Sequence, residues 1–189
     1  NESKPGFVEA DTLAHCGDSL SGDFVYTVNS VDIATSWNEQ RAVWGKGEAC
    51  VLAAIKDIET YMPFPILGFD SDNGGEFLNY HLLRHFADRV KPVQFTRSRP
   101  YHKDDNAHVE QKNWTHIRQW FGYHRLNKKK IVDLMNELYR SQWRLYHNFF
   151  QPSTKLIEKK VIASKVFKRY DKPKTPYERV LESKHVAPS

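Results

Sequence analysis

The arrangement of the chain is decided by residues 66–77, which read Ile-Leu-Gly-Phe-Asp-Ser-Asp-Asn-Gly-Gly-Glu-Phe. Residues 66–69 are a short apolar run, which is typical of a buried strand. Residues 70–75 contain only Asp, Ser, Asn and Gly, the residues that favour turns. Ligands commonly bind beyond the carboxyl ends of strands in open α/β sheets, so this junction predicts a functional end of such a sheet.

The residues before this junction predict an antiparallel start to the sheet. Residues 6–15 and 24–33 are rich in β-branched and aromatic side chains and predict two strands, which the polar residues 17–23 join. A third strand is expected over residues 35–44. An apolar periodicity of three to four residues then predicts a helix over residues 47–61, which Pro63 and Pro65 end.

The residues after the junction predict helices and one further strand. We expect a helix over residues 77–90, a strand over 93–96, a polar loop over 97–106, and long helices over 107–121 and 129–148. The fold class is therefore α/β, with a five-stranded mixed sheet flanked by helices, in which the fourth and fifth strands run parallel to the first. This order of elements resembles the ribonuclease H-like fold.

Charge divides the chain into two parts. Residues 1–120 carry 12 Lys and Arg against 17 Asp and Glu, whereas residues 121–189 carry 16 against 6. We expect a catalytic core over residues 1–150 and an irregular, basic extension over 151–189 that contacts a polyanion and can be removed without unfolding the core. The alternatives are a solvated basic tail, or a tail that packs on the domain, since residues 161–170 can form a strand.

The cysteines and the apolar runs exclude several protein classes. The cysteines, Cys16 and Cys50, form no CxxC pair, so neither a disulfide framework nor a zinc site of that type is expected. No run of eighteen apolar residues and no signal-peptide pattern occurs. These absences predict a soluble, cytoplasmic protein. Because the first residue is Asn1 and not Met, we also expect the sequence to be a piece of a longer protein.

Three acidic residues are the candidates for a reaction site. Asp11 lies within a predicted strand, where Asp is disfavoured; Asp72 follows the strand of residues 66–69; and Glu110 lies in the first turn of a helix. Each alone has an ordinary explanation, as a solvent-facing acid, a turn residue or an acid at a helix dipole. If the first and fourth strands are neighbours, however, the three carboxylates approach one another and repel unless a cation is bound.

Oxygen ligands of this kind suit Mg²⁺, with substrate phosphate completing the coordination. Two such ions about 3.5–4 Å apart activate an attacking oxygen and stabilise a leaving one. The residues alone therefore predict metal-assisted phosphodiester chemistry.

Three blocks of sequence resemble the conserved blocks of the D,D-35-E catalytic core. They are Asp11-Thr12, residues 71–77, and residues 99–101 followed by 105–110, and together they span a resemblance over about residues 5–150. This core is shared by retroviral integrases and bacterial insertion-sequence transposases, and residues 110–114 are more similar to the bacterial enzymes. One departure is that 37 residues, 73–109, separate the last two acids, and we expect the two additional residues in the loop 97–106.

The resemblance implies a DNA transposase or integrase. It makes Asp11, Asp72 and Glu110 the catalytic and metal-binding acids, favours Asp72 over Asp70, and implies Mg²⁺ or Mn²⁺, two ions in all. It implies cleavage at the ends of an element and joining of the freed 3′-hydroxyl to target DNA, by a homo-oligomer on double-stranded DNA in the bacterial cytoplasm. A ribonuclease H-like nuclease without strand transfer and a catalytically inactive, domesticated DNA-binding module are the alternatives.

Basic and aromatic side chains near the expected site have separate interpretations. The candidates for DNA-backbone contact flank the catalytic end of the sheet and are Arg97, Arg99, Lys103, Lys112 and Arg118. Residues 128–130 and the lysines of the tail are expected to add a salt-dependent contribution. Aromatic side chains at helical spacing are expected to be core rather than base-stacking residues; they are Trp114, Trp120, Phe121, Trp143 and Tyr146.

Overall fold

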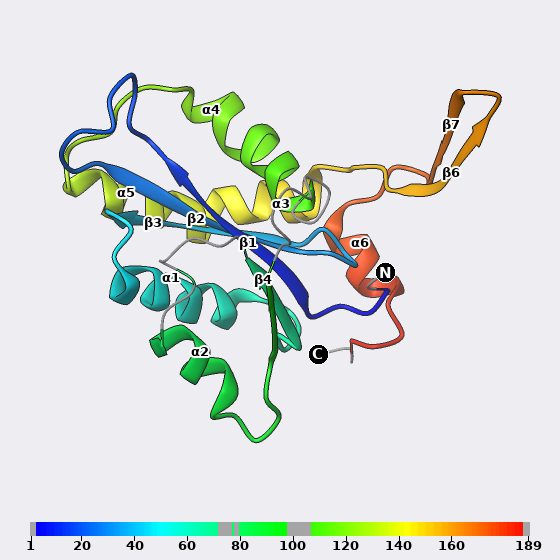
Figure 1. The fold of residues 1–189 in the computed structure, drawn as a ribbon, viewed down its shortest axis with the longest axis horizontal. Helices are drawn as coiled ribbons and strands as arrows, with labels where there is room; N and C mark the ends of the chain where they lie inside the picture. The colour runs from blue at the N-terminus through cyan, green and yellow to red at the C-terminus, as the bar shows by residue number, and fades with distance from the viewer. Residues whose placement is uncertain (1–2, 72–76, 78–79, 98–106, 187–189) are drawn as a thin grey trace.

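The computed structural model describes residues 3–71, 77, 80–97 and 107–186 (Figure 1). Asp72, Arg99 and Lys103 lie outside these described residues, as does most of the predicted loop 97–106. Within the described ranges, no helix is both long and apolar enough to cross a membrane.

The centre of the protein is a five-stranded mixed sheet with the strand order β3-β2-β1-β4-β5. The first three strands are antiparallel, and β4 and β5 run parallel to β1. The bounds are Phe7–Ala14 for β1, Val25–Asp32 for β2, Asn38–Trp44 for β3, Gly68–Ser71 for β4 and Gln94–Arg97 for β5. The predicted fold class is confirmed, and each predicted strand agrees with the observed one to within a few residues.

Alternation along the strands gives the sheet two different faces. Helices α1 (Glu48–Tyr61) and α2 (Tyr80–Ala87) lie on one side, where Val8, Ala10 and Val28 contribute to the larger apolar core (Figure 1). On the other side, a smaller apolar cluster joins β2 and β3 to the C-terminal helices. Polar side chains such as Glu9, Asn29 and Asn38 occupy the rest of this second side, where Asp11 also lies.

Two long helical segments cover the second side, as predicted. The first consists of α3 (Ala107–Lys112), the π-helical η1 (Asn113–Arg118) and α4 (Gln119–Phe121). The second consists of α5 (Lys130–Leu138), η2 (Tyr139–Trp143) and η3 (Tyr146–Phe150).

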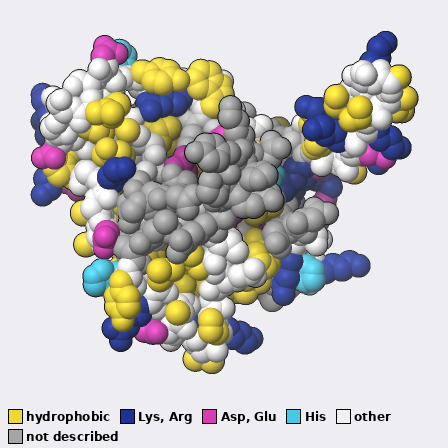
Figure 2. All heavy atoms as spheres, in the orientation of Figure 1, with side chains coloured by type: hydrophobic (Ala, Val, Ile, Leu, Met, Phe, Trp, Pro, Cys, Tyr) yellow, Lys and Arg dark blue, Asp and Glu magenta, His cyan; other side chains and the backbone are white. Residues whose placement is uncertain are grey.

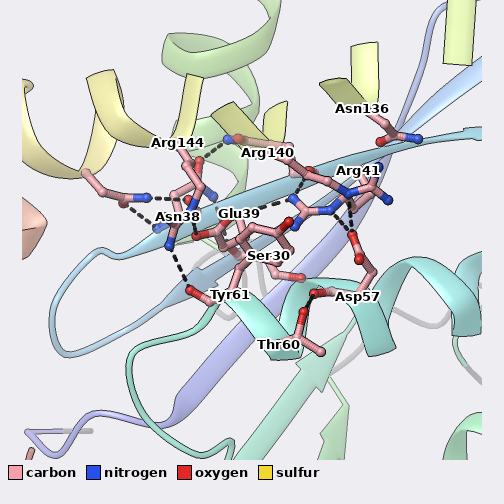
Figure 3. Close-up of polar contacts among 12 residues, drawn as sticks. Ser30, Asn38, Glu39, Arg41, Asp57, Thr60, Tyr61, Asn136, Arg140 and Arg144 are labelled. Carbon is pink, nitrogen blue, oxygen red and sulfur yellow. Dashed lines mark hydrogen bonds and ion pairs between the residues drawn. The ribbon is translucent and has the colours of Figure 1, made fainter. Parts of the chain in front are cut away.

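A network of buried charges ties the second helical segment to the sheet and to α1 (Figure 3). Glu39 of β3 accepts a 3.0 Å hydrogen bond from Arg144, and Arg41 of the same strand pairs with Asp57 of α1. The guanidinium groups of Arg41 and Arg144 lie 4.6 and 5.2 Å from the centre of the Tyr61 ring. These contacts help to fix the position of the helical segment, because the Glu39 carboxylate that Arg144 bonds to is fully buried and needs charged partners inside the protein.

The prediction of an irregular tail is wrong. Residues 156–170 form an antiparallel hairpin of β6 (Leu156–Ile162) and β7 (Lys165–Tyr170), and α6 spans Pro176–Glu182. Ala163 and Ser164 turn the hairpin with positive φ angles of 46° and 67°, which match the twist of a two-residue turn but lack the usual Asn-Gly signature.

The end of the tail is part of the packed structure. Pro176 stands in the first turn of α6, a position that proline favours, and Thr175 and Glu178 cap the helix. Val180 of α6 is buried in the larger core. Removal of all residues after Pro152 would therefore uncover part of the core, and independent folding of residues 1–150 stays a prediction.

The expectation that the helical aromatic residues form core is also wrong for several of them. Trp114, Trp120 and Tyr146 are 51%, 54% and 41% exposed, whereas Phe121 and Trp143 pack against the smaller cluster. The helical segments contact the sheet through residues such as Ile117 and Tyr139, both fully buried. Among the described residues, no further helix or strand covers the aromatic side chains on the outer side of these segments.

Candidate active site

Glu9 holds the start of the helix that carries Glu110. Its side chain is 3% exposed, and its Oε2 accepts hydrogen bonds of 3.0 Å from the backbone N–H groups of both His108 and Val109. These N–H groups belong to the first turn of α3, where no carbonyl within the helix can pair with them. The next residue is Glu110, so this contact sets the place of that acid beside β1.

Glu9 is also close to two other acids. Burial raises the pKa of Glu9 to about 7 against the opposing effect of its two hydrogen bonds, and the charges of Asp70 and Glu110 raise it further. A carboxyl group in this environment favours its protonated form, which reduces the repulsion among the acids of the site. This residue was missed by sequence reasoning, although alternation puts Glu9 on the same face of the strand as Asp11.

Asp11 is half-buried and oriented by two hydrogen bonds. Its Oδ1 accepts from the backbone N–H of Thr12 at 2.7 Å, and its Oδ2 accepts from the side-chain amide of Asn113 at 2.6 Å. Asn113 lies three residues after Glu110 in the same helical segment, which is the spacing of neighbours on one helix face. The segment that supplies the third acid therefore also orients the first.

A chain of amide side chains continues from Asn113 across the sheet. Asn29 of β2 donates to Asn113 Oδ1 at 2.8 Å, and Asn38 of β3 donates to Asn29 Oδ1 at 2.6 Å. Asn148 of η3 exchanges two hydrogen bonds of 2.9 Å with the backbone of Asn38. Buried polar groups are costly when unpaired, so this chain holds Asp11 in a fixed relation to three elements of the fold.

The strand register pairs the residues that stand directly before the first two predicted acids. Strands β1 and β4 are parallel neighbours, and the paired residues include Glu9 with Asp70 and Ala10 with Ser71. Asp11 and Asp72 are the residues that follow Ala10 and Ser71 in the chain. The structure thus brings Asp11 and Glu110 to the same part of the sheet, whereas Asp72 lies outside the described residues.

The donors at this site suit a hard divalent cation. Asp11 and Glu110 offer carboxylate oxygens, the ligands that Mg²⁺ and Mn²⁺ prefer. The described residues alone contain no group of three or more His, Cys, Asp and Glu side chains arranged to hold a metal ion. Asp72, the remaining predicted ligand, lies outside the residues that were searched, so the three-acid site stays a prediction.

Two of the five predicted DNA-contact residues serve contacts inside the protein. Lys112 is 7% exposed, and burial, with the charges of Lys155 and Arg179, lowers its pKa to about 8. Arg118 donates to the carbonyl of Ala14 at 2.8 Å and lies over the ring of Tyr123. Both basic groups are thus directed toward the protein in this structure.

The three remaining candidates lie at the end of β5 and in the residues that follow it. Arg97 ends β5, and Arg99 and Lys103 fall outside the described part of the chain. A DNA contact by any of the five residues stays a prediction.

Comparison with known proteins gives one sequence relative. No protein-family model matches the chain. The uncharacterized protein y4rM of Sinorhizobium fredii (strain NBRC 101917 / NGR234) is 42% identical over 179 residues, which is 95% of this chain. The chain spans about half the length of this relative, 50%.

Three of the solved structures with a similar fold come from retroviruses. The catalytic core domain of BIV integrase has a TM-score of 0.62 at 16% identity, covering 95% of this chain and 96% of that one. A simian T-cell lymphotropic virus intasome in complex with a PP2A regulatory subunit gives 0.64 at 14% identity, covering 100% and 58%. The HTLV-2 integrase catalytic core domain in complex with magnesium gives 0.56 at 13% identity, covering 79% and 90%.

These similarities extend over the sheet and its helices. The chain has the fold of retroviral integrase catalytic cores, as the ribonuclease H-like resemblance predicted. The finer relation to bacterial insertion-sequence transposases stays a prediction.

Proposed function

We propose that this chain is the catalytic core of a DNA transposase or integrase, which cuts and joins phosphodiester bonds with Mg²⁺ or Mn²⁺. The observation that carries the proposal is that strand β1 is bonded both to β4 and to the start of the helix that carries Glu110. Strands β1 and β4 are paired up to Ala10 and Ser71, directly before Asp11 and Asp72, and Glu9 anchors the helix of Glu110 beside them. The fold shared with integrase cores, one of them in complex with magnesium, supports the same chemistry.

Asp11, Asp72 and Glu110 would hold the metal ions. When bound, two divalent ions activate the attacking oxygen and stabilise the leaving oxygen of an in-line displacement at phosphorus. Asn113 restricts the rotation of the Asp11 carboxylate by bonding to Oδ2, so that its remaining lone pairs keep one direction. Glu9 fixes the helix start without a permanent charge, because its raised pKa favours the neutral carboxyl group near and below pH 7.

The same site would serve two successive reactions. Water first cuts the DNA strand at the end of an element, and the freed 3′-hydroxyl then attacks target DNA. We propose that the enzyme acts as a homo-oligomer, since two DNA ends must be joined, and that it works on double-stranded DNA in the cytoplasm of a bacterium. The relative from Sinorhizobium fredii supports the bacterial setting. We propose that Arg97, Arg99 and Lys103, which precede the helix of Glu110 in the sequence, contact the phosphate backbone of the DNA.

A strand-transfer assay tests this function against its two alternatives. The probe is a fluorescent duplex with a recessed 3′-hydroxyl, taken from the DNA that flanks the coding sequence, with supercoiled plasmid as target and Mn²⁺ as metal. We expect joined products from the wild-type chain and none from Asp11→Asn or with EDTA. Nicking without joining would instead identify a nuclease, and DNA binding without either reaction would identify a binding module.

A further inference from the structure

The β6–β7 hairpin stands away from the body of the protein. Figure 1 shows the two strands projecting beyond α6, and every residue from 156 to 170 is exposed except Glu158, which is half-buried. Each strand pairs with the other, from Leu156 with Tyr170 to Ile162 with Lys165. A two-stranded hairpin without a core is marginally stable in water, so this arm is expected to have a binding partner.

The base of this arm is nevertheless fixed firmly. Lys155 and Asp171, the residues on either side of the hairpin, are joined by two hydrogen bonds of 2.6 and 2.9 Å. The amine of Lys155 donates to the carbonyls of Ile33 and Ala34 in the turn after β2. Arg179 of α6 pairs with Asp171 at 2.5 Å, so the arm leaves the body in a defined direction.

The charges of the arm are arranged unfavourably for the protein alone. Five of its residues are basic and one, Glu158, is acidic; the basic residues are Lys159, Lys160, Lys165, Lys168 and Arg169. Lys159 lies directly opposite Lys168 in the register, and like charges at such positions repel. Because cross-strand partners share a face and neighbours alternate, both faces of the ribbon carry basic residues. Figure 2 shows dark blue Lys and Arg side chains around yellow apolar ones on the projecting arm. Glu158 pairs with Lys160 at 2.7 Å and with Arg169 at 3.2 Å, which offsets part of this positive charge. A polyanion would relieve the repulsion that remains among the other basic residues.

Apolar side chains lie between these charges. Seven of them are between 48% and 66% exposed: Leu156, Ile157, Val161, Ile162, Val166, Phe167 and Tyr170. Exposed apolar groups in such number mark a surface that is covered in a complex. In DNA complexes, apolar side chains pack on sugars or wedge between base steps, while Lys and Arg neutralise phosphates.

We infer that the β6–β7 hairpin is a DNA-binding arm that lies in a groove of duplex DNA. A two-stranded ribbon has the dimensions that the major groove admits. Pairing with the hairpin of a second copy is disfavoured, because it would bring two strongly basic edges together. The inference rests on the proposed function for the presence of DNA, but it concerns binding and not catalysis.

Two variants of the full chain test the arm. In the first, Asn-Gly replaces residues 156–170 between the bonded Lys155 and Asp171; in the second, all five basic residues of the hairpin become Gln. The matched control changes five exposed basic residues elsewhere to Gln: Lys4, Lys56, Arg84, Lys91 and Lys184. Affinity for a fluorescent 30-base-pair duplex is measured by anisotropy in EDTA over a series of NaCl concentrations, and thermal unfolding checks that each variant is folded.

We expect both hairpin variants to bind about tenfold or more weakly than the control at low salt. The slope of log affinity against log salt should become shallower by about 0.9 for each phosphate that the variant no longer neutralises. Slopes equal to that of the control would overturn the inference, as would a change in oligomeric state by light scattering with DNA binding intact. If the wild-type chain binds no duplex, the proposed function is contradicted as well. If the wild-type chain performs strand transfer but the hairpin variants have the same salt slope as the control, only the inference about the hairpin is wrong.

Discussion

The side-chain amide of Asn113 donates a 2.6 Å hydrogen bond to Oδ2 of Asp11, across 102 positions of the chain. Asn113 accepts in turn from Asn29, and it lies on the helical segment that Glu9 anchors and that carries Glu110. One side chain therefore couples the orientation of the first acid to the placement of the third.

Asn113→Ala should weaken both stability and catalysis. The change leaves the buried amide of Asn29 without this acceptor, which costs roughly 1–3 kcal/mol of unfolding free energy. It also removes one of the hydrogen bonds that orient the Asp11 carboxylate. Urea unfolding and strand transfer measure the two effects. Asn127→Ala, at an exposed loop position, is the control and should change neither quantity. Wild-type values for Asn113→Ala would show that the amide chain does not support the site.

Neutralising each acid of the proposed triad should nearly abolish cleavage and strand transfer without unfolding the protein. Asp11→Asn, Asp72→Asn and Glu110→Gln each remove a ligand charge with little change in volume, and the loss of mutual repulsion can raise stability without metal. Asp70→Asn is the control and should remain active. Wild-type turnover in any of the three variants would exclude that residue from the triad.

Glu9 should tolerate Gln but not Ala. Both of its hydrogen bonds end on one oxygen, which the amide oxygen of Gln can replace, so Glu9→Gln should retain the start of α3. Glu9→Ala leaves the N–H groups of His108 and Val109 without an acceptor, at roughly 1–3 kcal/mol each. Denaturant unfolding of the two variants side by side provides the comparison, and equal losses would refute an anchoring role.

The protein should lose stability in mild acid, partly through His15. Burial, together with the charge of Arg118, lowers the pKa of His15 from 6.5 to about 4. The unfolded chain therefore binds this proton at a higher pH than the folded protein, and the unfolding free energy falls between pH 6.5 and 4. The full shift is worth roughly 3 kcal/mol.

His15→Gln should make that pH dependence shallower, as measured by urea unfolding at several pH values. His81→Gln, at an exposed position of α2, is the matched control and should keep the wild-type slope. Identical slopes for the two variants would mean that His15 is not the group responsible.

Local patterns were sufficient for the sheet. The choice of Asp72 over Asp70 depended on the family resemblance, and the acidic triad stays a prediction. Alternation assigned Asp11 to one face of its strand, and Asp11 indeed faces the helix of Glu110 through Asn113. The amide chain could not be predicted, because an isolated Asn in sequence is typical of a surface, and its burial depends on partners as distant as Asn38 and Asn148. The hairpin turn at Ala163 and Ser164 could not be predicted either, because these residues are not a typical turn sequence. Their conformation is decided by the pairing of the two strands.

The most direct test of the proposed metal chemistry is a crystal structure of the chain soaked in Mn²⁺, with the ions located by anomalous scattering. We predict one or two Mn²⁺ ions between the carboxylates of Asp11 and Asp72, with Glu110 nearby. Carboxyl groups of Asp11 and Asp72 more than about 8 Å apart would contradict the account, because two ions about 3.5–4 Å apart could not then be bridged by these residues. Mn²⁺ bound only elsewhere would contradict it equally.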